Sequence, residues 1–232
     1  MIANEFSLTV TRHEVLSGEV HRTFLDISRS VYRYQPGQYL NIILRSGKAC
    51  PFSIANAPNG TELELHIRQV EGSAVTDEII AAIEQGTLKV SLAQGQCTVR
   101  QGERPILMIA GGTGIAPLKA MLEALEQQED GRPRYLIWGS HQQEGLYLHN
   151  DFQQITAKTF HYIPTVEQVG VAGPFIVGNV FAGLTVPGRP LADFDIYIAG
   201  SFAMVFAVRD RLVEMGANSQ TIYSDMLDLA GE

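Results

Sequence analysis

Residues 106–117 read ILMIAGGTGIAP, a run of aliphatic side chains followed by three glycines around one threonine and then a proline. An unbroken aliphatic run is typical of a strand that is covered on both faces. The glycines permit a sharp turn and a close approach of a ligand to the backbone. The helix expected from Ala116 would point its unpaired N–H groups and its positive dipole end at that turn. The stretch therefore predicts a strand–turn–helix unit that binds an anion such as a dinucleotide pyrophosphate, and an ordinary glycine loop is the alternative.

The turn departs from the dehydrogenase fingerprint G-x-G-x-x-G, because Pro117 stands where the last glycine would be. The next expected strand ends at residues 139–141, Gly-Ser-His, and offers no acidic residue for a ribose hydroxyl. It offers no lysine or arginine for a 2′-phosphate either, which favours NADH over NADPH. Three basic residues remain open as phosphate contacts, namely Arg132, Arg134 and Arg209.

The chain before residue 102 is typical of a small β-barrel. Short alternating segments bounded by Pro, Gly and Ser predict an antiparallel barrel. The expected strands are 6–12, 20–27, 39–44, 63–68 and 88–92, and 51–55 is expected to open a further one. Apolar residues at helical spacing predict one helix over 73–83.

The chain from residue 102 onward alternates strands with helices, which predicts a doubly wound parallel sheet with helices on both faces. The expected strands are 106–110, 135–139, 160–166, 195–199 and 221–224, and the expected helices are 116–127, 149–156, 175–182 and 202–215. We therefore expect two domains, an antiparallel β-barrel over 1–101 and an α/β domain over 102–232.

The composition of the chain argues against several classes of protein. The net charge of −8 in 232 residues argues against binding to a nucleic-acid backbone. No apolar run approaches the ~20 residues that span a membrane, and residues 1–10 lack the basic and apolar regions of a signal peptide. Two cysteines form no disulfide framework, and the histidines show no metal-ligand spacing. We expect a cytoplasmic protein with no metal site and no membrane span.

The barrel half also carries a candidate ligand segment, PFSIA at 51–55. A hydroxyl beside an aromatic ring on a rigid strand suits a flavin, whose N5 needs a hydrogen-bond partner and whose ring needs apolar packing. The alternative is a plain barrel strand, with Phe52 in the core and Ser53 in solvent.

An ordered set of motifs joins the two halves: PFSIA at 51–55, HIR at 66–68, GSAVT at 72–76, AGGTG at 110–114 with Pro117, and YIAGS at 197–201 with Met204. This order resembles the ferredoxin-NADP reductase superfamily, and within it the bacterial NAD(P)H-flavin reductases. The resemblance covers essentially the whole chain. It implies hydride transfer from NADH or NADPH to a flavin, which could be riboflavin, FMN or FAD.

The resemblance also implies roles for individual residues. Ser53 would hydrogen-bond the flavin N5, Thr113 would place the nicotinamide, and Asp225 would supply an acidic group near N5. The implied flavin-binding residues are Pro51, Phe52, Ser53, His66, Ile67, Ser73 and Thr76. The implied nucleotide-binding residues are Gly111, Gly112, Thr113, Gly114, Pro117, Ser140, Gly200 and Met204.

Three departures from the family pattern bear on how the flavin is held. Cys50, expected to be the more exposed of the two cysteines, stands where the family commonly has an arginine that pairs with flavin phosphate, and a thiol cannot make those bidentate contacts. Ala199 replaces a frequent cysteine, and the tail 227–232 has no aromatic residue to stack on the ring. These features favour a diffusible flavin. A subunit that retains FAD and passes electrons to an oxygenase or another protein, and a binding protein without turnover, are the alternatives.

Overall fold

The computed structural model of the chain describes residues 5–17, 19–170, 173–185 and 189–230. The described chain divides into two compact units. The first, here called the barrel unit, contains residues up to Val99 together with 119–128. The second, here called the sheet unit, contains 100–118 and the residues from Glu129 onward. Residues 1–4 of the expected leaderless N-terminus and 231–232 of the tail lie outside the described residues.

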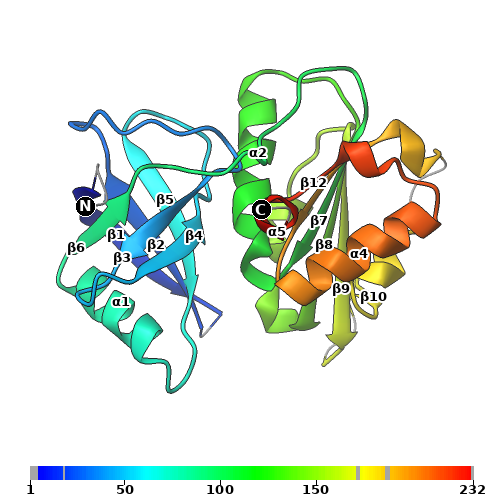
Figure 1. Cartoon of the computed structure of the whole chain (residues 1–232). Helices are drawn as coiled ribbons and strands as arrows, with labels where there is room; N and C mark the ends of the chain where they lie inside the picture. The colour runs from blue at the N-terminus through cyan, green and yellow to red at the C-terminus, as the bar shows by residue number, and fades with distance from the viewer. Residues whose placement is uncertain (1–4, 18, 171–172, 186–188, 231–232) are drawn as a thin grey trace. The chain divides into compact units, whose positions relative to one another are not determined.

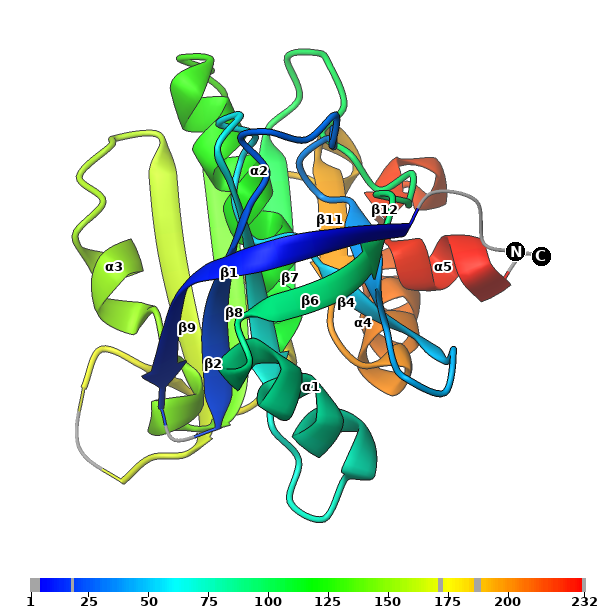
Figure 2. The same cartoon turned by 90° about the vertical axis from the view of Figure 1, so that its left-hand side faces the viewer.

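The barrel unit is a six-stranded antiparallel sheet with one helix (Figures 1 and 2). Its strands follow the order β4-β3-β6-β1-β2-β5, and a single antiparallel bridge between Ile54 and Leu65 joins the two end strands. The expected barrel is therefore confirmed. The elements are β1 (Glu5–Leu16), β2 (Val20–Asp26), β3 (Tyr39–Ile43), β4 (Ala49–Ser53), β5 (Glu62–Arg68), α1 (Ala74–Glu84) and β6 (Thr87–Ser91).

Alternation in the sequence explains the barrel core. Inward side chains of several strands, among them Leu25, Leu40 and Leu63, are fully buried in one cluster. Helix α1 adds Ile79 and Ile83 to that cluster, as its helical spacing predicts.

The sheet unit is a six-stranded parallel sheet in the order β10-β9-β8-β7-β11-β12 (Figure 1). The chain moves outward from β7 to β10 on one side and then returns to place β11 beside β7. The carboxyl ends of β7 and β11 therefore form a topological switch point, where open α/β sheets bind ligands. The strands are β7 (Ile106–Gly111), β8 (Arg134–Gln142), β9 (Phe160–Gln168), β10 (Ile176–Val177), β11 (Asp195–Ala199) and β12 (Ile222–Tyr223).

Helices cover the sheet as the alternating pattern predicts. The α-helices are α2 (Ile115–Gln127), α3 (His149–Gln153), α4 (Phe202–Glu214) and α5 (Asp225–Ala230). Val205, Val208 and Leu212 of α4 share one buried cluster with Leu107 and Ile109 of β7. On β8, Trp138 is fully buried and meets Phe152 of α3 edge-on, with ring centroids 5.7 Å apart.

Three sequence predictions in the sheet unit need correction, and one helix was not predicted. The helix expected over 175–182 is wrong, because Ile176–Val177 pairs with β9 as strand β10 and a 3₁₀ turn follows at Val180–Gly183. Gly178 adopts φ +132° and Asn179 caps that turn, so the apolar spacing never becomes an α-helix. Strand β8 runs on to Gln142, α3 ends at Gln153, and α5 was not expected.

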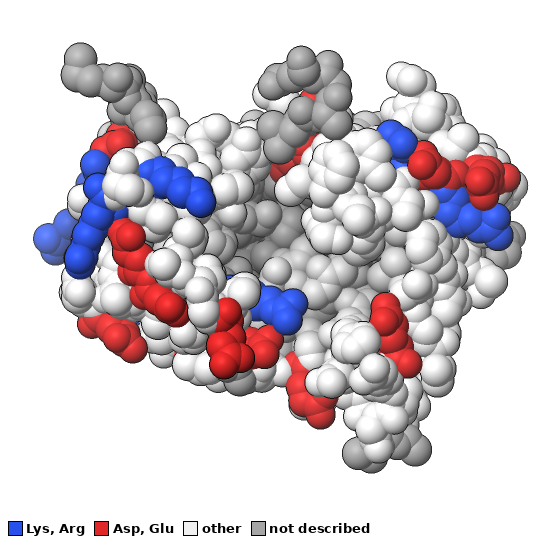
Figure 3. All heavy atoms as spheres, turned by 60° about the horizontal axis from the view of Figure 1, so that its bottom comes forward, with Lys and Arg blue, Asp and Glu red and all other residues white. Residues whose placement is uncertain are grey.

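Surface charge and helix length bear on two classes of protein that the composition argues against. On the face drawn in Figure 3, acidic and basic side chains are interspersed and neither sign forms a continuous field. No α-helix in the described ranges has both the length and the apolar character needed to cross a bilayer.

Candidate functional site

Strand β4 carries the segment that the sequence singles out for a flavin. Tyr39 pairs with Ser53, so Ser53 is the last residue of β4; the segment ends a strand instead of opening one. Among the described strands β4 pairs only with β3, and such an edge strand tolerates Pro51, which has no N–H to donate. Phe52 and Ser53 are half-buried. Within the described chain the Ser53 hydroxyl has no internal hydrogen-bond partner, which leaves it available to a ligand.

Strand β5 lies beside the end of β4. Along one edge, all seven residues of β5 pair with β2. Along the other edge, the described structure contains a bridge from Leu65 to Ile54, the residue after Ser53. The Ala55 N–H accompanies this bridge by donating to the Glu64 carbonyl at 2.8 Å. His66 and Ile67 follow directly with buried side chains, so this edge places them next to the end of β4.

A buried group of charged side chains lies next to this edge. The carboxylate of Glu64 receives hydrogen bonds from Arg22 Nε at 2.7 Å and from Lys119 Nζ at 2.9 Å, and His66 Nε2 lies 2.8 Å away. Burial acts to raise the pKa of Glu64, but the hydrogen bond from His66 and the charge of Lys119 outweigh it and lower that pKa to about 2. Because an ionised carboxylate only accepts, Nε2 of His66 must carry the proton.

Acid is expected to destabilise the protein in two steps through this group. Burial lowers the pKa of His66 below 6.5, more than Glu64 raises it. The unfolded chain therefore binds more protons than the folded chain, first below pH 6.5 at His66 and then below pH 4.5 at Glu64. The free energy of unfolding from urea titrations should fall through both windows as the pH is lowered. Glu64→Gln should flatten the lower window and, because Glu64 raises the pKa of His66, steepen the upper one. An unchanged slope below pH 4.5 would contradict the assignment.

The start of helix α1 uses its hydroxyls internally. Ser73 Oγ caps the helix by accepting from the Thr76 N–H, and Thr76 Oγ1 lies 3.2 Å from both the N and the O of Val70. The family resemblance implies that Ser73 and Thr76 contact a flavin. In the structure both side chains already serve the helix start.

The glycine turn after β7 packs tightly against the end of β11. A 3₁₀ turn spans Gly112–Gly114, and α2 begins at Ile115. A Cβ on Gly114 would clash with the carbonyl of Ala199 and lie 2.8 Å from the N of Gly200. A Cβ on Gly111 would clash with the Met204 sulfur. These glycines therefore let two loops of the switch point approach each other closely.

The outer side of the same turn is open. Gly112 adopts φ +52°, and a Cβ there would have no atom within 4 Å. Its carbonyl is held by the indole Nε1–H of Trp138 at 2.9 Å. Half-exposed Thr113 follows it, and its hydroxyl makes no internal hydrogen bond within the described residues. The turn therefore presents open space, a fixed backbone and an uncommitted hydroxyl, which suits a dinucleotide.

The remaining residues predicted for the nucleotide gather at the same sheet edge. Gly111 pairs with Gly139, so Ser140 lies one residue beyond the level of the turn on β8. Tyr197 pairs with Tyr223, which places Asp225, the first residue of α5, beyond the carboxyl end of β12. Pro117 is buried in the first turn of α2. Since carboxyl ends of parallel strands meet at one edge, the sheet unit brings its predicted residues together.

The sequence also missed an acidic residue at this edge. Because β8 runs on to Gln142 and pairs with β9, His141 Nδ1 lies 2.9 Å from Glu167 Oε2. A carboxylate therefore lies at this edge, on β9 and not directly after β8. Two of the arginines left open point elsewhere: Arg132 is buried against Asp130, and Arg134 is buried near Thr159.

One further expectation fails in the barrel unit. Cys50, expected to be the more exposed cysteine, is buried in the barrel core opposite Ile42. In the same unit, Glu123 accepts hydrogen bonds from Lys119 Nζ at 2.6 Å and from the Ala57 N–H at 2.9 Å.

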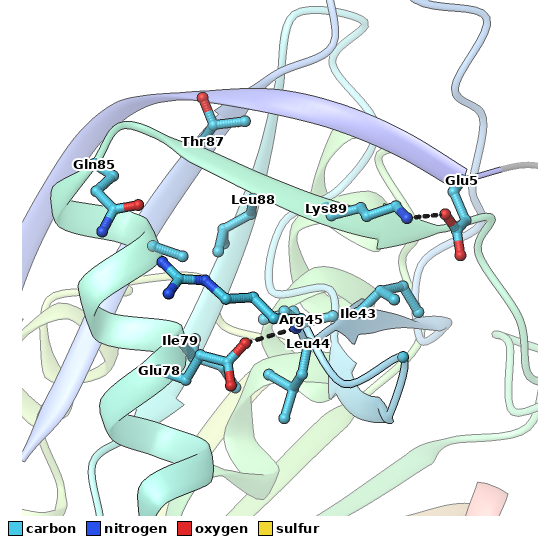
Figure 4. Close-up of a pocket in the computed structure, with 13 residues that line it drawn as sticks. Glu5, Ile43, Leu44, Arg45, Glu78, Ile79, Gln85, Thr87, Leu88 and Lys89 are labelled. Atoms are coloured by element: carbon cyan, nitrogen blue, oxygen red, sulfur yellow. Dashed lines mark hydrogen bonds and ion pairs between the residues drawn. The ribbon is translucent and has the colours of Figure 1, made fainter.

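A separate pocket of about 330 Å³ lies between α1, β3 and β6 (Figure 4). Charged residues that line this pocket bond to one another. Lys89 forms an ion pair with Glu5, and the backbone N–H of Arg45 donates to the Glu78 carboxylate at 2.7 Å. None of the residues predicted for flavin or nucleotide lines it.

Comparisons with known proteins agree on one group. The model of the oxidoreductase NAD-binding domain matches residues 108–210. The NAD(P)H-flavin reductase of Vibrio harveyi is 32% identical over 203 residues, which cover 83% of this chain and 86% of that protein. Reductase component 1 of the terephthalate 1,2-dioxygenase of a Comamonas species is 32% identical over 84% of this chain and 59% of its own length.

The fold has a solved counterpart. A ferredoxin NADP⁺ reductase from Neisseria gonorrhoeae, solved with bound FAD and NADP, superimposes with a TM-score of 0.78 over 92% of both chains at 19% identity. At this identity the likeness establishes the fold alone.

Proposed function

Because this chain belongs to the bacterial NAD(P)H-flavin reductases of the ferredoxin-NADP reductase superfamily, we propose that it reduces a diffusible flavin with NADH or NADPH. The nicotinamide gives a hydride from C4 to flavin N5, and one proton from solvent completes the dihydroflavin while NAD(P)⁺ is released. The cofactors carry this chemistry, and the protein binds and orients them. The observation that carries the proposal is the open glycine turn at the switch point of the sheet unit.

We assign the flavin to the barrel domain, 1–101, and the nucleotide to the α/β domain, 102–232. Ser53 would donate to flavin N5, and the end of β5 at His66 and Ile67 would lie along the ring. Thr113 would place the nicotinamide, and Asp225 would supply a nearby carboxylate. These roles are supported by the two uncommitted hydroxyls and by the gathering of the nucleotide residues at one sheet edge.

A diffusible flavin fits the polar groups of the barrel unit better than a tightly held one. Cys50 is buried and brings no cation to the end of β4, and Ser73 and Thr76 are engaged in capping α1. A flavin phosphate group would therefore find few hydrogen-bond donors in the barrel unit. Contacts to the isoalloxazine ring would then supply most of the binding free energy. Two free, buried thiols support a reducing, cytoplasmic setting.

Glu167 is expected to favour NADH over NADPH. A carboxylate at this edge can accept from a ribose 2′-OH and repels a 2′-phosphate. Glu167→Gln should lower the ratio of kcat/KM for NADH to that for NADPH by roughly tenfold. Glu214→Gln is the matched control, since Glu214 is also exposed and ion-paired. An unchanged ratio in Glu167→Gln would remove this residue from coenzyme selection.

The proposal is tested by NADH oxidation with purified, desalted protein. Oxidation that rises and saturates with added riboflavin or FMN, by a colourless protein, is the expected result. A yellow protein that NADH bleaches, with no gain from added flavin, would instead indicate an electron-transfer subunit, as in the oxygenase reductase that the chain resembles. Binding without oxidation of either nucleotide would indicate a non-catalytic binding protein.

A further inference from the structure

The buried charged group beside β5 holds the backbone that follows Ser53. We define the clamp as Arg22, Glu64, His66, Lys119 and Glu123. Three of its members come from β2 and β5, and two come from the part of α2 that belongs to the barrel unit. Ala55 and Ala57, which follow Ser53, accept or donate three hydrogen bonds to this group and to β5.

Lys119 is the centre of these contacts. Its ammonium nitrogen lies 3.0 Å from the carbonyl oxygen of Ala55, 2.9 Å from Glu64 Oε2 and 2.6 Å from Glu123 Oε1. An ammonium has three donors, so every one is used. The side chain is 11% exposed, which limits competition from water.

Glu123 holds the next part of the same segment. Its Oε2 accepts from the Ala57 N–H at 2.9 Å, while the Ala55 N–H donates to the carbonyl of Glu64 at 2.8 Å. Ala55 is therefore fixed through both its N–H and its carbonyl, two residues beyond Ser53. These bonds restrict the backbone that follows Ser53.

The clamp is electrically balanced in one protonation state. Glu64 and Glu123 carry two negative charges, and Lys119 and Arg22 carry two positive charges. The sum is zero while His66 is neutral, which is the state that its burial favours. Buried ion pairs often add little stability compared with apolar packing. Their directional bonds do define one geometry, which a site for a planar ring requires.

We propose that Lys119 is a positioning residue for flavin reduction, which acts by fixing the Ala55 carbonyl and thereby the Ser53 hydroxyl. This inference rests on the proposed function. Lys119→Met removes all three bonds while keeping most of the side-chain volume. We expect the dissociation constant for riboflavin, measured by quenching of its fluorescence, to rise about tenfold and kcat to fall about tenfold, with the KM for NADH unchanged.

Two further variants keep the test decisive. Lys89→Met is the matched control, because Lys89 is a half-exposed barrel lysine that is ion-paired with Glu5. Glu123→Gln leaves one oxygen where two bonds are accepted, so a rise of about threefold in the riboflavin dissociation constant is expected even if Lys119→Met fails to fold.

The outcomes separate this inference from the proposed function. If the wild-type protein does not reduce flavin, both fail. If the wild-type protein is active and the folded Lys119→Met and Glu123→Gln variants lose only urea resistance, with riboflavin binding and kcat unchanged, the clamp is structural and the inference is overturned. A change in the KM for NADH alone would overturn it as well.

Discussion

Gly114→Ala is expected to lower kcat/KM for NADH by about 100-fold. The added methyl group would overlap the Ala199 carbonyl, and backbone cannot rotate away as a side chain can. The turn must therefore move away from β11, and displacement of a binding loop by about 1 Å can cost about 100-fold in rate. Steady-state kinetics with saturating riboflavin measure the change. Overpacking of this kind should also lower stability by roughly 1–3 kcal/mol.

Gly131→Ala is the matched control in the same unit. Gly131 lies in the turn before β8, where an added Cβ would meet no atom within 4 Å and φ is ordinary. It should leave both kcat/KM for NADH and the midpoint of unfolding unchanged. A Gly114→Ala protein with wild-type kcat/KM for NADH would mean that the nucleotide does not bind at this turn.

Ser53→Ala is expected to lower kcat by about 100-fold with little change in stability. Among the described residues the hydroxyl bonds to nothing, so its loss leaves no buried group unpaired. A hydroxyl held at N5 orients the ring for the arriving hydride, and the loss of such positioning can cost about 100-fold in rate. The rate of flavin reduction at saturating NADH and flavin is the quantity to measure.

Ser7→Ala provides the comparison for Ser53→Ala, because Ser7 is an exposed serine on β1 of the same unit. It should retain wild-type kcat. If Ser53→Ala also retains the full rate, flavin N5 does not depend on this hydroxyl, and the assignment of the flavin to the end of β4 loses its main support.

Local sequence patterns predicted most of the helices and strands, because hydrophobic spacing and glycine positions determine local backbone structure. The aliphatic run at 106–110 followed by glycines identified β7 and its turn, and the spacing of isoleucines identified α1. The helix expected over 175–182 failed because apolar spacing alone could not show that Ile176–Val177 pairs with β9. Pairing between distant strands overrode the local pattern there.

The parts of the candidate site that are formed by neighbouring residues could be predicted from the sequence. The parts that are formed by residues far apart in the sequence could not. The turn at Gly111–Gly114 can be identified from four neighbouring residues, because three of them are glycines. Lys119 lies 55 positions from Glu64, and His141 lies 26 positions from Glu167. Only the fold brings these partners together. Cys50 was placed on the surface because its pairing opposite Ile42, which turns it into the core, was not visible.

The most direct measurement is anaerobic mixing of the protein with riboflavin and NADH, compared with NADH that carries deuterium at C4. The account predicts stoichiometric loss of the visible absorbance of oxidised flavin, in step with NADH oxidation, and slower loss with the deuterated nucleotide because the C4–H bond breaks in the reaction. Persistent flavin colour with both NADH and NADPH would contradict the account. So would NADH oxidation that leaves the flavin oxidised.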